Sequence, residues 1–141
     1  MQNKVRKKRW CCLCCLWMFF LLLAVGCDTE KKEKKIRDLS YTVVGEQEIP
    51  EELKKQIEGK KQQEFQLTFT EEDGLYLVRG YGEKPTGGYS VQVEECYLTK
   101  KAIYAKTTLH GPAEDEVTSE EKSYPYIVLK MERQEGMVVF Q

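Results

Sequence analysis

Beyond Lys61, apolar and polar residues alternate along the chain in several short segments. A repeat of two residues is that of a β-strand with one buried face, so each segment predicts a strand. Turn residues separate these segments at intervals of roughly ten positions. Alternation predicts strands over Phe65 to Phe69 and Tyr89 to Val93. Further strands are predicted over Leu75 to Tyr81, Ala102 to Leu109, Ile127 to Met131 and Met137 to Phe140. The pattern predicts an antiparallel β-sandwich or barrel, with an immunoglobulin-like sandwich as one form that it could take.

One helix is predicted ahead of these strands, over residues 49–59. Pro50 stands in its first turn and Gly59 follows its last turn. Its apolar residues recur every four positions and form a narrow stripe that we expect to pack against a sheet: Ile49, Leu53 and Ile57. Before the helix, the run from Leu39 to Val44 predicts a first strand. The predicted fold class is therefore mostly β with one short helix (α+β), in a single β-rich domain over residues 36–141.

The first 26 residues differ from the rest of the chain in composition. Basic residues come first, with no acidic residue among them, and an apolar run from Trp10 to Val25 follows. This order is typical of a signal peptide. A run of about 16 residues is also shorter than the roughly 20 that a helix needs to span a bilayer. An uncleaved signal anchor is the alternative.

The residues from Leu23 to Cys27 resemble the lipobox of bacterial lipoprotein precursors, with Ala24 in place of the commoner Leu. The resemblance implies that residues 1–26 are a lipoprotein signal peptide and that Cys27 carries a diacylglyceryl group. Two acyl chains give stable attachment to a membrane. Residues 27–35 then form the lipidated cysteine and a charged tether, which contains no residue suited to a core. The expected location is the cell envelope, at the outer face of the bacterial cytoplasmic membrane.

Charge and cysteine content argue against several classes of protein. All 23 acidic residues lie beyond the leader, so the remaining chain is acidic, and nucleic-acid binding, which needs a basic face, is not expected. Most of the 6 cysteines lie in the leader, without histidines or other ligands that would indicate a metal site: Cys11, Cys12, Cys14 and Cys15. With Cys27 lipidated, Cys96 is left alone. The domain must therefore be stabilised by a packed core rather than by disulfides.

The sequence shows no arrangement of residues typical of an enzyme. His110 is the one histidine and stands before Gly111-Pro112, at a predicted strand end. A small enzyme built on Cys96 and His110 is the alternative, but this pair lacks a positioning partner. The acidic residues from Glu114 to Glu116 lack the oxygen spacing of a calcium loop. We therefore expect a non-enzymatic protein with no catalytic residue, no metal and no cofactor apart from the lipid on Cys27.

Two loops carry the residues that we expect to bind a partner. In the first loop, a proline and paired glycines make a tight turn that presents Thr86. In the second loop, two tyrosines surround Pro125, and aromatic residues on a rigid turn bind a partner with little loss of entropy. A plain turn and core filling are the alternatives. The predicted partner-binding residues are Lys84, Pro85, Thr86, Gly87, Gly88, Tyr124, Pro125 and Tyr126.

These loops resemble those of a known family. The residues from Gly82 to Val91, with His110-Gly111-Pro112 and the residues from Ser123 to Val128, are similar to the C-terminal domain of PrcB, a family of protease-complex lipoproteins. The resemblance covers about residues 75–132. It implies a membrane-anchored accessory module that binds or stabilises a surface protease. We expect the partner to be a protein and the chain itself to be a monomer.

A second resemblance is to chagasin-type cysteine-protease inhibitors, which are immunoglobulin-like sandwiches. The segments Pro85-Thr86-Gly87-Gly88-Tyr89 and Tyr124-Pro125-Tyr126 occur in the order of two loops that these inhibitors present to a protease cleft. Three positions depart from the inhibitor pattern, since Lys84 replaces an Asn, Gly87 replaces a Thr and Tyr124 replaces an Arg. The resemblance implies an alternative function, inhibition of a protease through residues 84–89 and 123–126.

Overall fold

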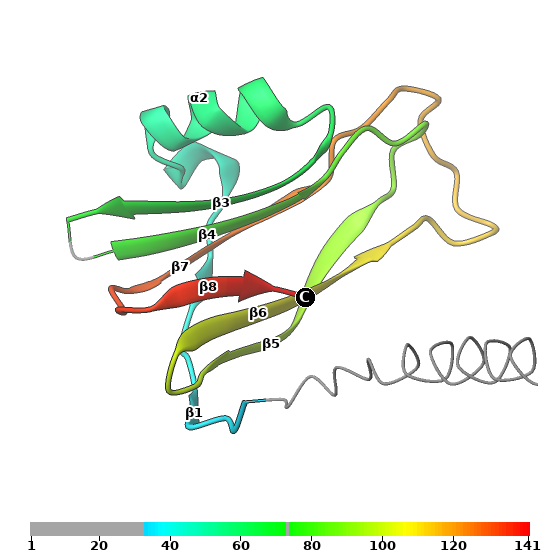
Figure 1. Ribbon diagram of the computed structural model, residues 1–141. Helices are drawn as coiled ribbons and strands as arrows, with labels where there is room; N and C mark the ends of the chain where they lie inside the picture. The colour runs from blue at the N-terminus through cyan, green and yellow to red at the C-terminus, as the bar shows by residue number, and fades with distance from the viewer. Residues whose placement is uncertain (1–32, 73) are drawn as a thin grey trace, which may run out of the picture. The chain divides into compact units, whose positions relative to one another are not determined.

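Two four-stranded β-sheets pack face to face, and one helix covers the far face of one sheet (Figure 1). The computed structural model describes residues 33–72 and 74–141, so the predicted signal peptide and Cys27 lie outside the described residues. The outer sheet has the strand order β1 (Arg37–Asp38), β5 (Ser90–Leu98), β6 (Ala102–His110) and β8 (Met137–Phe140). The central sheet has the order β2 (Thr42–Val43), β7 (Tyr126–Glu132), β4 (Gly74–Tyr81) and β3 (Glu64–Glu71). The helix is α2 (Glu51–Lys60), which follows a short 3-10 turn, η2 (Glu46–Glu48).

The predicted fold class, mostly β with one short helix, is confirmed. Of the two predicted forms, the structure is the sandwich, because the sheets are not closed into a barrel: β3 and β8 are edge strands of different sheets. Paired strands run antiparallel within the described ranges, except that β6 and β8 are parallel. The exception arises because β8 follows β7 of the central sheet and crosses to the outer sheet. Its direction is therefore not set by a hairpin with β6.

The central sheet is buried on both faces. The face toward the outer sheet contributes to one core cluster: Leu39, Leu75, Leu77, Cys96, Ile103, Ala105, Ile127, Leu129 and Met131. The other face lies under α2 in a second cluster: Ile49, Leu53, Ile57, Phe65, Tyr76, Val78 and Val128. Burial of a large apolar side chain contributes about 1.5–3 kcal/mol to stability. Because α2 buries Leu53 and Ile57 in this way, the helix stabilises the domain as a third layer. The prediction that its apolar stripe packs against a sheet is confirmed.

Burial on both faces explains the sequence of β4. The run Leu75-Tyr76-Leu77-Val78 contains no polar residue, whereas a strand with one exposed face would alternate. Leu75 and Leu77 belong to the cluster between the sheets, and Tyr76 and Val78 belong to the cluster under the helix. By contrast β3 is an edge strand with one apolar face, and its alternation is clear in the sequence.

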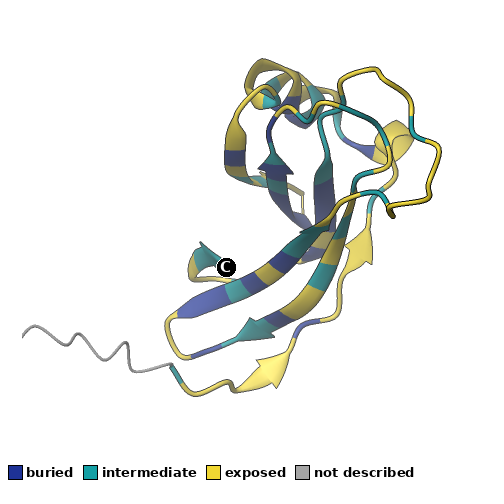
Figure 2. Ribbon diagram, turned by 90° about the vertical axis from the view of Figure 1, so that its right-hand side faces the viewer, coloured by how far each residue is buried: buried dark blue, intermediate teal, exposed yellow. Residues whose placement is uncertain are grey.

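The alternation in the outer sheet shifts by one residue within β5. Val93 pairs with Thr107 and Glu95 pairs with Lys106, so Glu94 is an extra residue that forms a β-bulge. The side chains that pack on the core come from odd positions before the bulge and from even positions after it: Val91, Val93, Cys96 and Leu98. Figure 2 shows the resulting bands of buried and exposed residues along the β5–β6 hairpin.

Several predicted boundaries differ from the structure. The strand predicted over Tyr89 to Val93 continues to Leu98 in β5, and α2 begins at Glu51 rather than at residue 49. Gly59 lies inside α2 rather than after it, because the helical turn continues until the Lys61 N–H donates to the Ile57 carbonyl at 2.9 Å. Of the strand predicted over residues 39–44, only Thr42 and Val43 form a strand, because Leu39 packs into the core between the sheets and the strand before it is Arg37–Asp38. As a result β1 pairs in the outer sheet and β2 in the central sheet. In the part of the chain that the structure describes, no helix is long and apolar enough to cross a membrane.

Candidate partner-binding surface

The structure brings the two predicted binding loops together. One loop, residues 82–89, follows β4, and the other, residues 111–125, precedes β7; we call them the paired loops (Figure 1). Lys84 and Ser123 form an antiparallel bridge in which the Lys84 N–H donates to the Ser123 carbonyl at 2.8 Å and the reverse bond is 3.0 Å long. The Ser123 hydroxyl also donates to the carbonyl of Thr86 at 2.6 Å. The paired loops therefore form one continuous surface.

A charged contact adds to these backbone bonds. The Lys122 ammonium lies 2.6 Å from a carboxylate oxygen of Glu83, and the Tyr124 hydroxyl donates to the other oxygen at 3.2 Å. The hydrogen bond from Lys122 lowers the pKa of Glu83, so this carboxylate stays ionised at neutral pH. The Lys61 ammonium, just beyond α2, lies 5.1 Å from the centroid of the Tyr124 ring. The Tyr124 side chain is thus held between the first loop and the end of the helix.

The paired glycines of the first loop allow its backbone to pack closely against the second loop. Gly88 has a φ of +82°, and a β-carbon there would lie 2.9 Å from atoms of both Pro112 and Thr118. A β-carbon on Gly87 would lie 2.8 Å from the Ser119 hydroxyl, and the Gly87 N–H donates to the Ser119 carbonyl. These two predicted binding residues therefore serve the packing of one loop on the other.

The remaining predicted binding residues differ in exposure. Pro85 is exposed, whereas Lys84 and Thr86 are half-buried between the loops. Tyr124 and Pro125 are half-buried and line an open groove of about 320 Å³ beside Val43 and residues near η2. Tyr126 packs against the cluster under α2, and burial raises the pKa of its phenol. The partly buried Tyr126 side chain therefore contributes to the core, which was the alternative to a binding role.

The second loop contains a feature that the sequence did not single out. Val117 is 98% exposed and therefore lies on the surface of the paired loops. Exposed carboxylates occupy both flanks of this valine: Glu114, Asp115, Glu116, Glu120 and Glu121. Residue type alone would have favoured a buried valine. The acidic residues on either side were the available signal that this segment stays in solvent.

Cys96 and His110 do not come together. Cys96 lies in the core at 4% exposure, and desolvation raises the pKa of its thiol to about 11. Its pairing partner on β6 is Ala105, five positions from the exposed His110, which corresponds to roughly 17 Å along a strand. A nucleophilic thiolate paired with this imidazole is therefore not formed. Among the described residues, no group of three or more His, Cys, Asp or Glu side chains could hold a metal ion.

Comparison with known proteins gives one match. The family model described as PrcB C-terminal matches residues 75–132. A search of curated proteins and a search of solved structures each found no match. The matched range runs from β4 to β7 and contains both of the paired loops. Residues 75–132 of this chain therefore belong to the PrcB C-terminal domain family.

Proposed function

We propose that this protein is a membrane-anchored lipoprotein that acts as a protein-binding accessory module, and that its partner is a surface protease. The observation that carries the proposal is the hydrogen-bonded pairing of two loops, distant in sequence, within the segment that matches the PrcB C-terminal family. The anchor is supported by the leader and the lipobox-like sequence before Cys27. The accessory role is the one that the family resemblance implies.

Rigid loops favour binding because little conformational entropy is lost when a partner is engaged. The paired loops are held by backbone bonds between Lys84 and Ser123 and by the Glu83–Lys122 ion pair. They present an apolar side chain, Val117, inside an acidic segment. A complementary partner surface has an apolar pocket surrounded by basic side chains. Association should therefore weaken as the salt concentration rises.

The test is co-purification of the tagged full-length chain from detergent-solubilised membranes, with peptidase activity toward labelled casein as the readout. We expect peptidase activity in the captured fraction of the wild type and its loss with Val117→Asp. The melting temperature should stay unchanged, because substitutions at exposed positions alter stability by less than about 0.5 kcal/mol. The matched control is Met137→Asp, since Met137 is 71% exposed but lies on β8, outside the paired loops. Capture without peptidase activity would contradict the proposed partner, and equal capture by both variants would contradict the proposed surface.

A second function, inhibition of a papain-like protease, is favoured by one observation. The two segments that resemble inhibitor loops lie side by side on the paired loops, as simultaneous contact with one cleft requires. Titration of the purified protein against papain separates the two functions. An inhibitor abolishes turnover at a stoichiometric amount, whereas an accessory module leaves turnover unchanged.

A further inference from the structure

The chain joins its domain at the end of the outer sheet that lies away from the paired loops. The Ile36 N–H donates to the carbonyl of Leu98 at 2.8 Å, at the last residue of β5. The first residue of β5, Ser90, follows directly after the first of the paired loops. The 9 residues of β5 span roughly 30 Å, and Figure 1 shows the β5–β6 turn and the paired loops at opposite ends of this hairpin.

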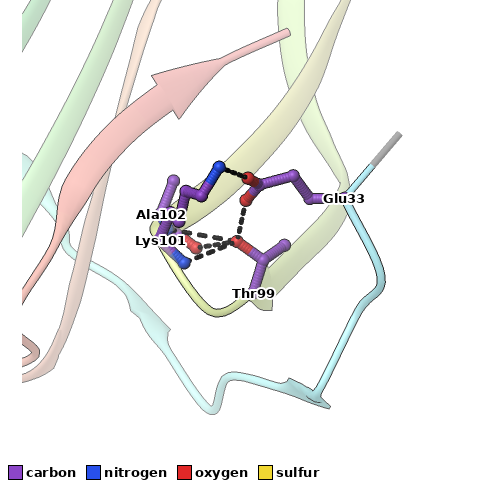
Figure 3. A network of polar contacts seen from close by, with 4 residues as sticks. All are labelled: Glu33, Thr99, Lys101 and Ala102. Atoms are coloured by element: carbon purple, nitrogen blue, oxygen red, sulfur yellow. Dashed lines mark hydrogen bonds and ion pairs between the residues drawn. The ribbon is translucent and has the colours of Figure 1, made fainter. Parts of the chain in front are cut away.

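A polar network ties the N-terminal segment to the β5–β6 turn (Figure 3). The Thr99 hydroxyl donates to one carboxylate oxygen of Glu33 at 2.8 Å, and the Lys101 ammonium lies 3.1 Å from the other. The N–H of Ala102 in turn donates to the Thr99 hydroxyl oxygen at 3.1 Å. The hydrogen bonds from Thr99 and from Lys101 lower the pKa of Glu33, which keeps this carboxylate ionised. The network therefore places the segment around Glu33 beside the turn.

Basic side chains gather at this junction. An open groove of about 460 Å³ is lined by Glu33 and by five exposed residues that we call the anchor-side patch: Lys34, Lys35, Ile36, Lys100 and Lys101. Acidic groups offset part of the charge, since Glu33 pairs with Lys101, Asp38 pairs with Lys35, and Glu95 also interacts with Lys35. Lys34 and Lys100 add a surplus of positive charge. Ile36, at 56% exposure, adds an apolar side chain among the ammonium groups.

The length of chain before the patch limits its distance from the proposed anchor. Cys27 and Glu33 are six positions apart, and even a fully extended segment of that length spans only about 20 Å. Charges at a surface act over a Debye length of about 8–10 Å at physiological salt. A lipidated Cys27 would therefore hold the anchor-side patch close to the field of an anionic membrane. The acidic paired loops, at the other end of the hairpin, would be repelled by the same field.

We propose that the anchor-side patch rests on anionic phospholipid headgroups, with Ile36 against the membrane surface, and so orients the paired loops away from the membrane. This inference rests on the proposed lipid anchor at Cys27. A lipid anchor on a flexible tether would leave the domain free to rotate above the membrane. Contact between the patch and the headgroups would fix its orientation. The orientation keeps the paired loops accessible to a partner.

The full-length lipidated protein, bound to preformed vesicles, provides the test. One set of vesicles contains phosphatidylcholine alone and the other contains phosphatidylcholine and phosphatidylglycerol in equal parts. An amine-reactive reagent that cannot cross the bilayer labels exposed lysines, which are then read by peptide mass spectrometry. We expect labelling of Lys100 and Lys101 to fall several-fold in the anionic vesicles and to recover at high salt, while Lys84 and Lys122 on the paired loops label equally in both. Equal labelling of Lys100 and Lys101 in both sets would overturn the inference.

A matched pair of variants locates the effect. Lys100→Gln with Lys101→Gln should reduce the protection of Lys34 and Lys35, because the patch loses half of its lysines. Lys55→Gln with Lys60→Gln removes the same charge from exposed positions of α2 and should leave that protection intact. The mass of the N-terminal peptide separates the two levels of failure. A Cys27 without lipid contradicts the proposed anchor, whereas a lipidated protein without protected lysines contradicts only the orientation.

Discussion

At Gly88 the backbone of the first paired loop packs directly against side chains of the second. Its φ of +82° lies in the left-handed region, which costs a residue with a β-carbon about 1–2 kcal/mol. The 2.9 Å approach to Pro112 and Thr118 adds a steric cost. We therefore expect Gly88→Ala to lower the free energy of unfolding by at least about 1–2 kcal/mol, as measured by urea denaturation.

Gly45 is the matched control at the residue scale. Its φ is −70°, and a β-carbon would have no atom within 4 Å. Gly45→Ala should change the free energy of unfolding by less than about 0.5 kcal/mol. If Gly88→Ala lowers the free energy of unfolding no more than Gly45→Ala does, the inference that the paired loops pack closely at Gly88 is wrong.

Helix α2 stabilises the domain at the scale of elements. Leu53 is 0% exposed and lies in the cluster that the helix forms with the central sheet. Leu53→Ala should cost about 2–5 kcal/mol, because it leaves a cavity between two layers. The measurement is the urea midpoint of unfolding. Lys55→Ala, on the exposed face of the same helix, should cost less than about 0.5 kcal/mol. Equal effects would mean that the helix does not form this layer.

The ion pair between the paired loops predicts a titration. Since the hydrogen bond from Lys122 is the largest cause of the lowered pKa of Glu83, Lys122→Gln should raise that pKa toward its ordinary value of about 4.3, and Lys122→Arg should preserve the lowered value. Side-chain carbonyl shifts in a nuclear magnetic resonance titration measure this pKa. Because the folded-state pKa is lowered, the contribution to stability is present above the unfolded-state pKa and is lost as pH falls through the folded-state value. An unchanged pKa in Lys122→Gln would exclude the contact.

Attachment to the membrane belongs to the scale of the whole molecule. If Cys27 is lipidated, Cys27→Ser should accumulate as an unprocessed precursor that incorporates no labelled palmitate. Cys96→Ser is the control, because Cys96 is buried in the core and should take no part in lipidation. Gel mobility and palmitate incorporation in growing cells measure both effects. Equal incorporation by the wild type and by Cys27→Ser would rule out this anchor.

Local patterns in the sequence were sufficient to predict α2 and the strands from β3 to β8, but they did not predict β1. The alternation of Phe65, Leu67 and Phe69 predicted β3, and the spacing of Leu53 and Ile57 predicted a helix with one buried face. Both signals depend on residues a few positions apart, and a local period is set by which side of a single element is buried. Proline and glycine also indicated turns in the two loops that the structure pairs, although their role in binding stays a prediction.

Long-range packing decided how those elements are combined. Leu75 to Val78 reads as one apolar run, and only the helix on one face and the outer sheet on the other explain it. The bond from Ser123 to Thr86, the core position of Tyr126 and the contact of Glu33 with Thr99 join residues far apart in the chain. No local pattern encodes such contacts, because they form only when sheets and helix bury their apolar faces together. The same packing buries Cys96, for reasons that lie outside its immediate sequence.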